Sequence, residues 1–255
     1  MNILALDTSG TAASAALMNE YIIIAESSAA LFRNGGPSAS EVLLPMVDKL
    51  FKITKMSLED IDFIACTCGP GSFTGLRIGA STAKGLAFAS GKPLIAVPTL
   101  DAMAYTITDL SSPLIWAVPM MDARRGQVYS AIYCGADRIT DYLAEPVEVV
   151  LQMLKNQIQD QLKNQVKENA HIAFLGEGAV LHRSLISNED WLQDITISFQ
   201  NRNSAVSVGG KAIDLAKIKM AGCEDYANEK DFSLMYLRKP QAQRELEVNQ
   251  NVSHN

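Results

Sequence analysis

The sequence predicts an α/β protein with mixed sheets, built as two lobes. Short apolar runs of strand length alternate with longer stretches of helical periodicity through the first 110 residues. A second alternation of the same kind starts near Ser111. In each half the first buried-type strand ends in an aspartate, Asp7 and then Asp122, and a tight turn and a returning strand follow. This echo indicates an internal duplication.

Size and charge limit what the chain can do on its own. A length of 255 residues is enough for two lobes with separate cores. The net charge of −6 argues against a basic surface that binds nucleic acid unaided. No apolar run approaches the ~20 residues that span a bilayer, and no basic segment precedes the first apolar run. We therefore expect a cytoplasmic protein without a membrane segment.

We place the first lobe at residues 1–110. Tight turns separate three strand-like runs at its start, so we expect a meander. Ser38 and Glu41 have the spacing of a capping box at the start of a helix over 38–54. A strand at 62–68 leads through the sequence GPGSFTG into a helix over 72–90. A short strand after Lys92-Pro93 and another helix follow.

The second lobe is placed at residues 111–238. It begins with a buried strand that ends at Asp122, and it continues with a helix over 147–166 and a strand at 171–175. A last helix over 203–221 is a candidate to pack back on the first lobe. Residues 239–255 are polar and aperiodic, so we expect a disordered tail.

The four cysteines do not have the spacing of a metal site. Cys66 and Cys68 lie two apart in a predicted strand, and neither Cys134 nor Cys223 has a second cysteine or a histidine beside it. We interpret them as small buried apolar residues, and we expect no metal.

The glycine-rich stretch GPGSFTGLRIG matches neither common phosphate-binding loop. Leu76 and Arg77 follow Gly75 where a P-loop needs Lys and Ser or Thr, and the glycine spacing differs from that of dinucleotide-binding folds. Two hypotheses remain. Ser72 can cap the helix, or the free N–H groups there can hold an anion together with the Ser72 and Thr74 hydroxyls. The residue types favour the cap.

The helix over 72–90 carries a stripe of small residues. Gly75, Gly79 and Ala83 recur every fourth residue, and Ala80 and Ala87 widen the stripe. Glycine inside a helix costs about 1 kcal/mol relative to alanine, so a repeated glycine predicts close packing. The stripe either packs on the chain's own sheet or docks a second subunit, and we expect docking. Arg77, Ser81 and Lys84 lie on another side, where they either bind anions or face solvent.

Several motifs together resemble one protein family. They are LALDTS, SEVLLP, GPGSFTGLRIG, STAKGLA, MDARRGQVY, GEGA and YLRKPQA, and they run in order from Leu4 to Ala242. This set is similar to the bacterial TsaB (YeaZ) proteins of tRNA threonylcarbamoyladenosine synthesis. The resemblance implies a two-lobed actin-like and sugar-kinase-like (ASKHA) fold. It also implies a non-catalytic subunit that binds a catalytic TsaD-type paralogue, is joined by a TsaE-type ATPase, contacts tRNA only indirectly and forms a homodimer when alone.

In that family the two helices of the first lobe form the subunit interface. The interface residues implied for this chain are Ser40, Glu41, Leu44, Val47, Gly75, Leu76, Gly79, Ala80, Ala83 and Ala87. One residue departs from the family pattern, because Ala39 stands where relatives commonly have histidine before Ser-Glu. Any contact that this histidine makes is missing here.

The resemblance also bears on catalysis. The catalytic paralogue binds metal through two histidines four residues apart on a helix, whereas this sequence has only His171, His182 and His254. Weak ATP or ADP binding between the lobes stays open. Its candidate ligands are Asp7, Thr8, Ser72, Thr74, Arg77, Asp122 and Arg124. For the strand-end residues we favour a structural role in turns. The alternative function is a stand-alone ASKHA-type ATPase or small-molecule kinase.

Overall fold

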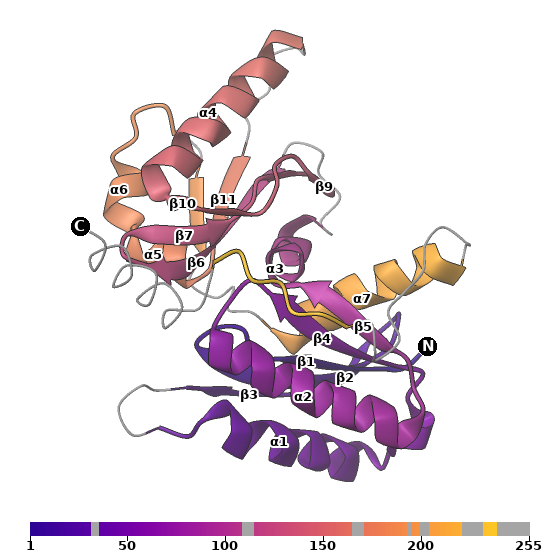
Figure 1. Cartoon of the computed structure of the whole chain (residues 1–255). Coiled ribbons are helices and arrows are strands. Elements are labelled where there is room, and N and C mark those ends of the chain that lie inside the picture. Colours follow the sequence, from indigo (N-terminus) through magenta and orange to yellow (C-terminus); the bar gives the residue numbers. More distant parts are fainter. Residues whose placement is uncertain are drawn as a thin grey trace, which may run out of the picture.

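The computed structural model describes residues 1–31, 36–108, 115–164, 171–192, 195–198, 204–220 and 232–238. These residues form two lobes, each built on its own sheet (Figure 1). The predicted boundary at 110 and 111 falls in segment 109–114, outside the described residues. The predicted tail at 239–255 lies outside them as well.

The first sheet has five strands in the order β3-β2-β1-β4-β5. Their bounds are β1 (Ile3–Asp7), β2 (Ala12–Met18), β3 (Ile23–Ala30), β4 (Phe63–Gly69) and β5 (Leu94–Pro98). The first three form the expected antiparallel meander, while β4 runs parallel to β1 and β5 parallel to β4. Every residue of β1 and β2 is buried, because helices cover both faces of the sheet.

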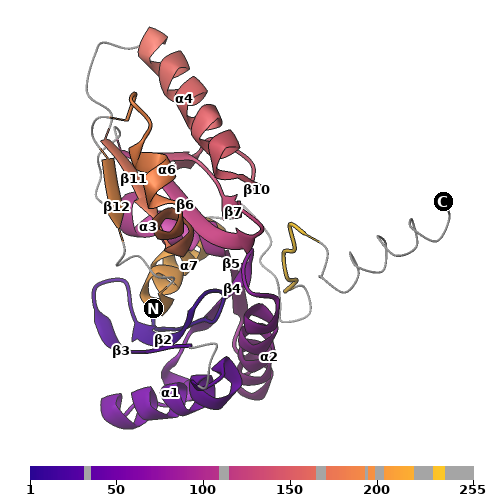
Figure 2. The same ribbon diagram turned by 90° about the vertical axis from the view of Figure 1, so that its left-hand side faces the viewer.

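Helices α1 (Ala39–Thr54) and α2 (Phe73–Ser90) lie side by side on one face of this sheet, and α7 (Ala205–Met220) covers the other (Figure 2). Alternate residues of β1 serve the two faces, as the period of a strand requires. Leu4 and Leu6 pack in the core under α1 and α2, whereas Ile3 and Ala5 pack with α7. Helix α7 therefore belongs to the first lobe in space, although it follows the second sheet in sequence.

The second sheet has the strand order β10-β7-β6-β11-β12, with the short pair β8 and β9 added beside β6. Its strands are β6 (Ile115–Arg124), β7 (Gln127–Ser130), β8 (Tyr133–Cys134), β9 (Asp137–Arg138), β10 (Leu143–Pro146), β11 (His171–Leu175) and β12 (Ile195–Ser198). Helices α4 (Val147–Asn164), α5 (Glu177–Leu181) and α6 (Arg183–Ser187) contribute to the core on one face. Helix α3 (Thr99–Thr108) packs on the other.

The two sheets repeat one topology. In each, a central strand pairs with an antiparallel neighbour that pairs with a second one, and on its other side two strands run parallel. Strand β1 thus corresponds to β6, and Asp7 and Asp122 lie near the ends of corresponding strands. The expected duplicated α/β architecture with mixed sheets is confirmed.

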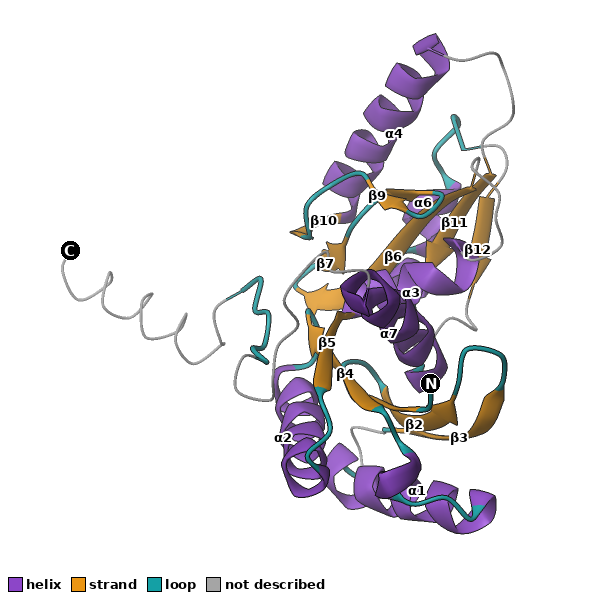
Figure 3. Cartoon of the chain, turned by 90° about the vertical axis from the view of Figure 1, so that its right-hand side faces the viewer, coloured by secondary structure: helices purple, strands orange, loops and turns teal. Residues whose placement is uncertain are grey.

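Helices α3 and α7 fill the space between the sheets (Figure 3). Two adjacent glycines allow α7 to approach its neighbours closely. A Cβ at Gly209 would overlap the Met18 sulfur, and a Cβ at Gly210 would overlap the Tyr105 ring. Side chains larger than glycine would push α7 away from β2 and α3.

Candidate functional site

The glycine-rich loop between β4 and α2 docks on the end of β1. The Ser72 N–H donates to the Ser9 carbonyl oxygen (2.7 Å), and the Gly75 N–H donates to Ser72 Oγ (3.3 Å). A Cβ at Gly71 would lie 2.5 Å from the same Ser9 oxygen, so the close approach requires glycine. Ser72 therefore caps α2, as the residue types favoured. The N–H groups of Ser72 and Gly75 therefore already have hydrogen-bond acceptors within the chain, so they are not free to bind an anion.

The stripe of small residues on α2 faces inward. Its members and their apolar neighbour are buried against the first sheet, namely Gly75, Leu76, Gly79, Ala80, Ala83 and Ala87. A Cβ at Gly75 would overlap the Thr8 carbonyl oxygen, and one at Gly79 would overlap Thr8 Oγ1. Of the two alternatives for this stripe, the structure shows packing on the chain's own sheet, and close packing of α2 on β1 and β4 explains the glycines.

The interface residues expected on α1 occupy different positions: one caps the helix, one is buried and two are exposed. The Glu41 carboxylate accepts hydrogen bonds from the Ser38 N–H (2.6 Å) and from Ser38 Oγ (2.7 Å), which forms the predicted capping box. These hydrogen bonds, the backbone one first, lower the pKa of Glu41. Val47 is buried in the core of the first lobe, so its side chain is not on the surface of this chain. Ser40 and Leu44 are exposed.

The exposed sides of α1 and α2 carry apolar and small residues. Leu44 of α1 is 54% exposed, and Phe88 of α2 is 78% exposed. Ser81, Gly85 and Phe88 are exposed at positions i, i+4 and i+7, which place them on one side of α2. Apart from the backbone of α2 itself, no atom of the described residues lies within 4 Å of where a Gly85 Cβ would be. We call Leu44, Ser81, Gly85 and Phe88 the outer face.

Asp7 is sealed inside the first lobe. Its Oδ1 accepts hydrogen bonds from the Ser9 N–H (3.0 Å), Ser9 Oγ (2.6 Å) and Thr67 Oγ1 (2.8 Å), and Oδ2 has no partner among the described residues. Burial raises the pKa of Asp7, although these hydrogen bonds partly oppose that effect. Thr8 is also buried, and its hydroxyl donates to the Gly75 carbonyl oxygen (2.7 Å). The structure therefore gives neither residue an exposed surface for a nucleotide.

Asp122 plays the equivalent part in the second lobe. Its Oδ1 accepts a hydrogen bond from the Arg124 N–H (2.7 Å), just as Asp7 accepts from the N–H two residues later. Arg124 and Arg125 have positive φ angles of 68° and 57° in the turn into β7. The Arg124 guanidinium lies 3.7 Å from Asp122 Oδ2. Both aspartates support strand ends and turns, which agrees with the structural role that we favoured.

Comparison with known proteins shows which family this chain resembles in sequence. The TsaD family model, described as tRNA N6-adenosine threonylcarbamoyltransferase, matches residues 37–241. A "tRNA threonylcarbamoyladenosine biosynthesis protein TsaB" from Bacillus subtilis (strain 168) is 32% identical over 188 residues, which cover 74% of this chain and 76% of that protein. The chain belongs to the TsaB family. The TsaB protein of Escherichia coli (strain K12) is 38% identical over 133 residues, about half of each chain (52% and 55%).

A solved structure shares the fold of this chain. YeaZ from Pseudomonas aeruginosa superposes with a TM-score of 0.69 over 92% of this chain and 99% of that one, at 24% sequence identity. At this identity the likeness concerns the fold. The two-lobed fold that the TsaB resemblance implied is thus shared with YeaZ along nearly the whole of both chains.

The motif YLRKPQA, one of those that carry the TsaB resemblance, begins in a segment for which the sequence analysis predicted no structural element. Residues 232–238, which we call the strap, run from the first lobe to the second beside α2 (Figure 1). Phe232 is buried in the core under α1 and α2, and the Met235 N–H donates to the Cys68 carbonyl oxygen (2.7 Å). Arg238 donates from its guanidinium to the Ala123 carbonyl oxygen (2.7 Å). The seven residues of the strap follow no strand or helix period, so the hydrophobic pattern gave no signal.

A polar cluster between α3 and the second sheet was also missed. Asp101 Oδ1 accepts hydrogen bonds from the hydroxyls of Tyr133 (2.6 Å) and Tyr142 (2.8 Å), and Arg138 lies 4.0 Å from it. Burial raises the pKa of both tyrosines, and the negative charge of Asp101 raises it further. The cluster therefore holds α3 against β8–β10. No motif could have shown it, since Asp101 lies more than thirty residues before the two tyrosines.

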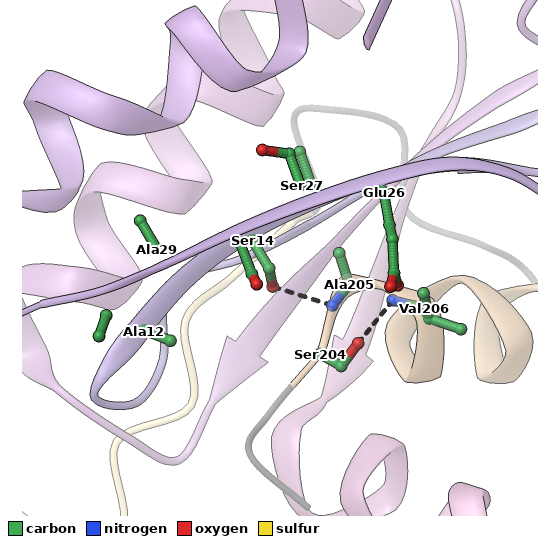
Figure 4. Close-up of a pocket in the computed structure, with 11 residues that line it drawn as sticks. Ala12, Ser14, Glu26, Ser27, Ala29, Ser204, Ala205 and Val206 are labelled. Carbon is green, nitrogen blue, oxygen red and sulfur yellow. Dashed lines mark hydrogen bonds between the residues drawn. The ribbon is translucent and has the colours of Figure 1, made fainter. Parts of the chain in front are cut away.

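A hollow of about 210 Å³ lies between β2, β3 and the start of α7 (Figure 4). Ser14 Oγ accepts a hydrogen bond from the Ala205 N–H (2.9 Å), and Ser204 Oγ accepts one from the Val206 N–H (3.2 Å). The Glu26 side chain points toward the same helix start (Figure 4). Serines that cap the helix and a carboxylate near its positive end account for these polar groups. These polar groups thus attach the start of α7 to the first sheet.

Three further properties concern metal binding, the cysteines and the helices. Among the residues that the structure describes, no group of three or more His, Cys, Asp or Glu side chains could hold a metal ion. Cys66 and Cys68 are buried, free thiols, and burial raises the pKa of Cys68 to about 12. Of the helices in the described ranges, none has both the length and the apolar character needed to cross a membrane.

Proposed function

We propose that this chain is a non-catalytic subunit of a complex that makes threonylcarbamoyladenosine in tRNA, beside the anticodon. Its partner is a TsaD-type catalytic paralogue, and the outer face of α1 and α2 binds it. One observation supports this binding mode above the others: a large apolar side chain, Phe88, lies exposed beside Gly85, around which no atom crowds. An exposed apolar surface of this kind is typical of a site that binds another protein.

The non-catalytic part of the proposal rests on the sequence. The three histidines of the whole chain are His171, His182 and His254, and no two of them have the spacing of a helical metal pair. Asp7, the residue that best matches a phosphate-site carboxylate, is buried by its own lobe. Both features favour a subunit that supports another enzyme over a stand-alone ATPase or kinase.

Other partners follow from the same proposal. A TsaE-type ATPase joins the pair, and tRNA is bound through the catalytic paralogue, because a chain with net charge −6 has little to attract phosphates. With a role in tRNA modification, we expect the chain to act in the cytoplasm. In the absence of the paralogue, two copies associate through the same outer face, so homodimer and heterodimer exclude each other.

Reconstitution tests the proposal. Purified TsaD-type paralogue from the same organism is assayed for tRNA modification alone, with this chain, and with a chain that carries Val149→Arg on α4 as a surface control. We expect the chain alone to be inactive, and we expect the chain and its control variant to raise the paralogue's rate equally. Threonylcarbamoyl transfer by the chain alone would contradict its non-catalytic role, and no effect on the paralogue would contradict the partnership.

A further inference from the structure

A groove of about 410 Å³ runs between α2 and the strap. Arg77, Ser81 and Lys84 line it from α2, and Phe232, Leu234 and Tyr236 line it from the strap. Arg77 and Lys84 give the groove two positive charges above an apolar and aromatic floor. The groove adjoins the outer face, because Ser81 belongs to both and Phe88 follows Lys84 by one helical turn on the same side of α2. The charges and aromatic rings of the groove are present whichever partner the outer face binds.

Arg77 is held in place before any ligand binds. Its guanidinium stacks 3.7 Å from the centre of the Phe73 ring, and its Nε donates to the Tyr236 hydroxyl (3.2 Å). The Phe73 and Tyr236 rings lie 5.1 Å apart, so both aromatic side chains fix the arginine. A planar guanidinium restrained in this way loses little entropy when its remaining N–H groups bind an oxyanion.

Lys84 adds a second charge along the same groove. Its Nζ lies 5.5 Å from the centre of the Phe232 ring. Among the described residues, neither Arg77 nor Lys84 has an acidic partner, whereas Lys52, Arg124, Arg138 and Lys217 each do. Two cations next to an apolar floor and without an acidic neighbour form a surface that is complementary to acidic and apolar groups.

We propose that this groove binds an acidic stretch of polypeptide. Arg77 and Lys84 are two helical turns apart, which corresponds to ~10 Å along α2. An extended polyproline-like segment rises ~3.1 Å per residue and returns to the same side every third residue. Two acidic residues three apart in such a segment therefore reach both cations. An apolar side chain next to them packs on Phe232 and Leu234.

A protein segment fits the groove better than a nucleic acid does. A phosphate backbone gains its affinity from many cations in a row, and this groove offers two in a chain whose net charge is −6. The apolar floor can bury an aliphatic side chain, whereas a polar sugar–phosphate chain gains nothing from contact with it.

Selection from a displayed library of random short peptides, with the folded full chain as target, tests the proposal. The best selected peptide is then synthesised with a fluorophore, and its affinity is measured by anisotropy. We expect acidic residues three apart in the selected sequences, and we expect Lys84→Gln to weaken binding about tenfold, or ~1.4 kcal/mol. Arg77→Lys keeps the charge but loses the planar fork, so we expect it to weaken binding too.

The matched control is Arg183→Gln, which removes an exposed arginine of α6 in the second lobe and should leave the affinity unchanged. Thermal unfolding of each variant checks that the strap stays in place. Selected peptides without paired acidic residues, or equal affinity for the parent and the Lys84→Gln chain, would overturn the proposal. A fluorescent single-stranded RNA that binds and is released by Lys84→Gln, while acidic peptides do not bind, would overturn it in favour of nucleic acid.

Discussion

Thr8 and Gly75 lock the first turn of α2 onto the end of β1. Thr8 Oγ1 donates a 2.7 Å hydrogen bond to the Gly75 carbonyl oxygen, and the Thr8 carbonyl oxygen occupies the space where a Gly75 side chain would begin. One turn later, Gly79 packs on Thr8 Oγ1 and on the Cys66 sulfur. The small residues of α2 are thus a packing requirement within the first lobe, and the surface left for a partner lies on the opposite side of the helix.

Alanine substitutions on the buried and on the exposed side of α2 should have opposite effects on stability. Gly79→Ala places a Cβ against Thr8, so we expect it to lower the free energy of unfolding by about 1–3 kcal/mol, even though alanine favours helix. Gly85→Ala adds a Cβ in open space and should raise the free energy of unfolding by up to about 1 kcal/mol. Urea unfolding measures both. Changes of the same sign at the two positions would contradict the burial of the stripe.

Asp7→Asn should change how stability depends on pH. Because burial raises the pKa of Asp7, the folded chain keeps this proton at pH values where the unfolded chain has released it. The parent's stability therefore falls as the pH rises from the unfolded value of about 3.9 toward the raised folded value. Asparagine does not titrate and keeps an acceptor for Ser9 and Thr67.

The measurement is urea unfolding of parent and variant at a series of pH values. Relative to the parent, the free energy of unfolding of Asp7→Asn should increase as the pH rises from about 4 to neutral. A difference that stays constant across this range would show that the Asp7 pKa is not raised in the folded state.

Asp101 is expected to be the main polar link between α3 and the second sheet. Asp101→Ala leaves the hydroxyls of Tyr133 and Tyr142 without their acceptor, so we expect it to cost about 2–4 kcal/mol of stability. Asp101→Asn keeps an acceptor oxygen and should cost less. Asp141→Ala removes an exposed aspartate near the same strands and serves as control. Equal unfolding midpoints for Asp101→Ala and Asp141→Ala would contradict this role.

The sequence predicted those parts of the fold that have local signals. The capping box at Ser38, the cap at Ser72 and the duplicated strand ends at Asp7 and Asp122 depend on residues within a few positions of each other, and the structure confirms them. The direction in which the stripe faces was predicted wrongly. Repeated glycines show that something approaches α2 closely, but the spacing is the same whether that neighbour is Thr8 or another protein.

The strap and the Asp101 cluster could not be predicted for a different reason. Phe232 reaches the first lobe's core, and Tyr236 reaches Phe73, across more than a hundred residues of sequence. Such contacts depend on how the lobes and their connections are arranged in space, and no periodicity encodes that. The groove beside Arg77 is visible only after the strap has been placed next to α2.

Binding of the TsaD-type paralogue by a Gly85→Arg chain tests the central claim most directly. Beyond the backbone of α2, no atom in the described part of the chain lies within 4 Å of the position of the Gly85 Cβ, so the variant should fold. Arginine should also stabilise the helix relative to glycine by up to about 1 kcal/mol. Its long side chain covers the outer face between Ser81 and Phe88. Calorimetry with purified paralogue should then show binding to the parent and to Val149→Arg, and a loss of binding by Gly85→Arg. Undiminished binding by a folded Gly85→Arg chain would contradict the account.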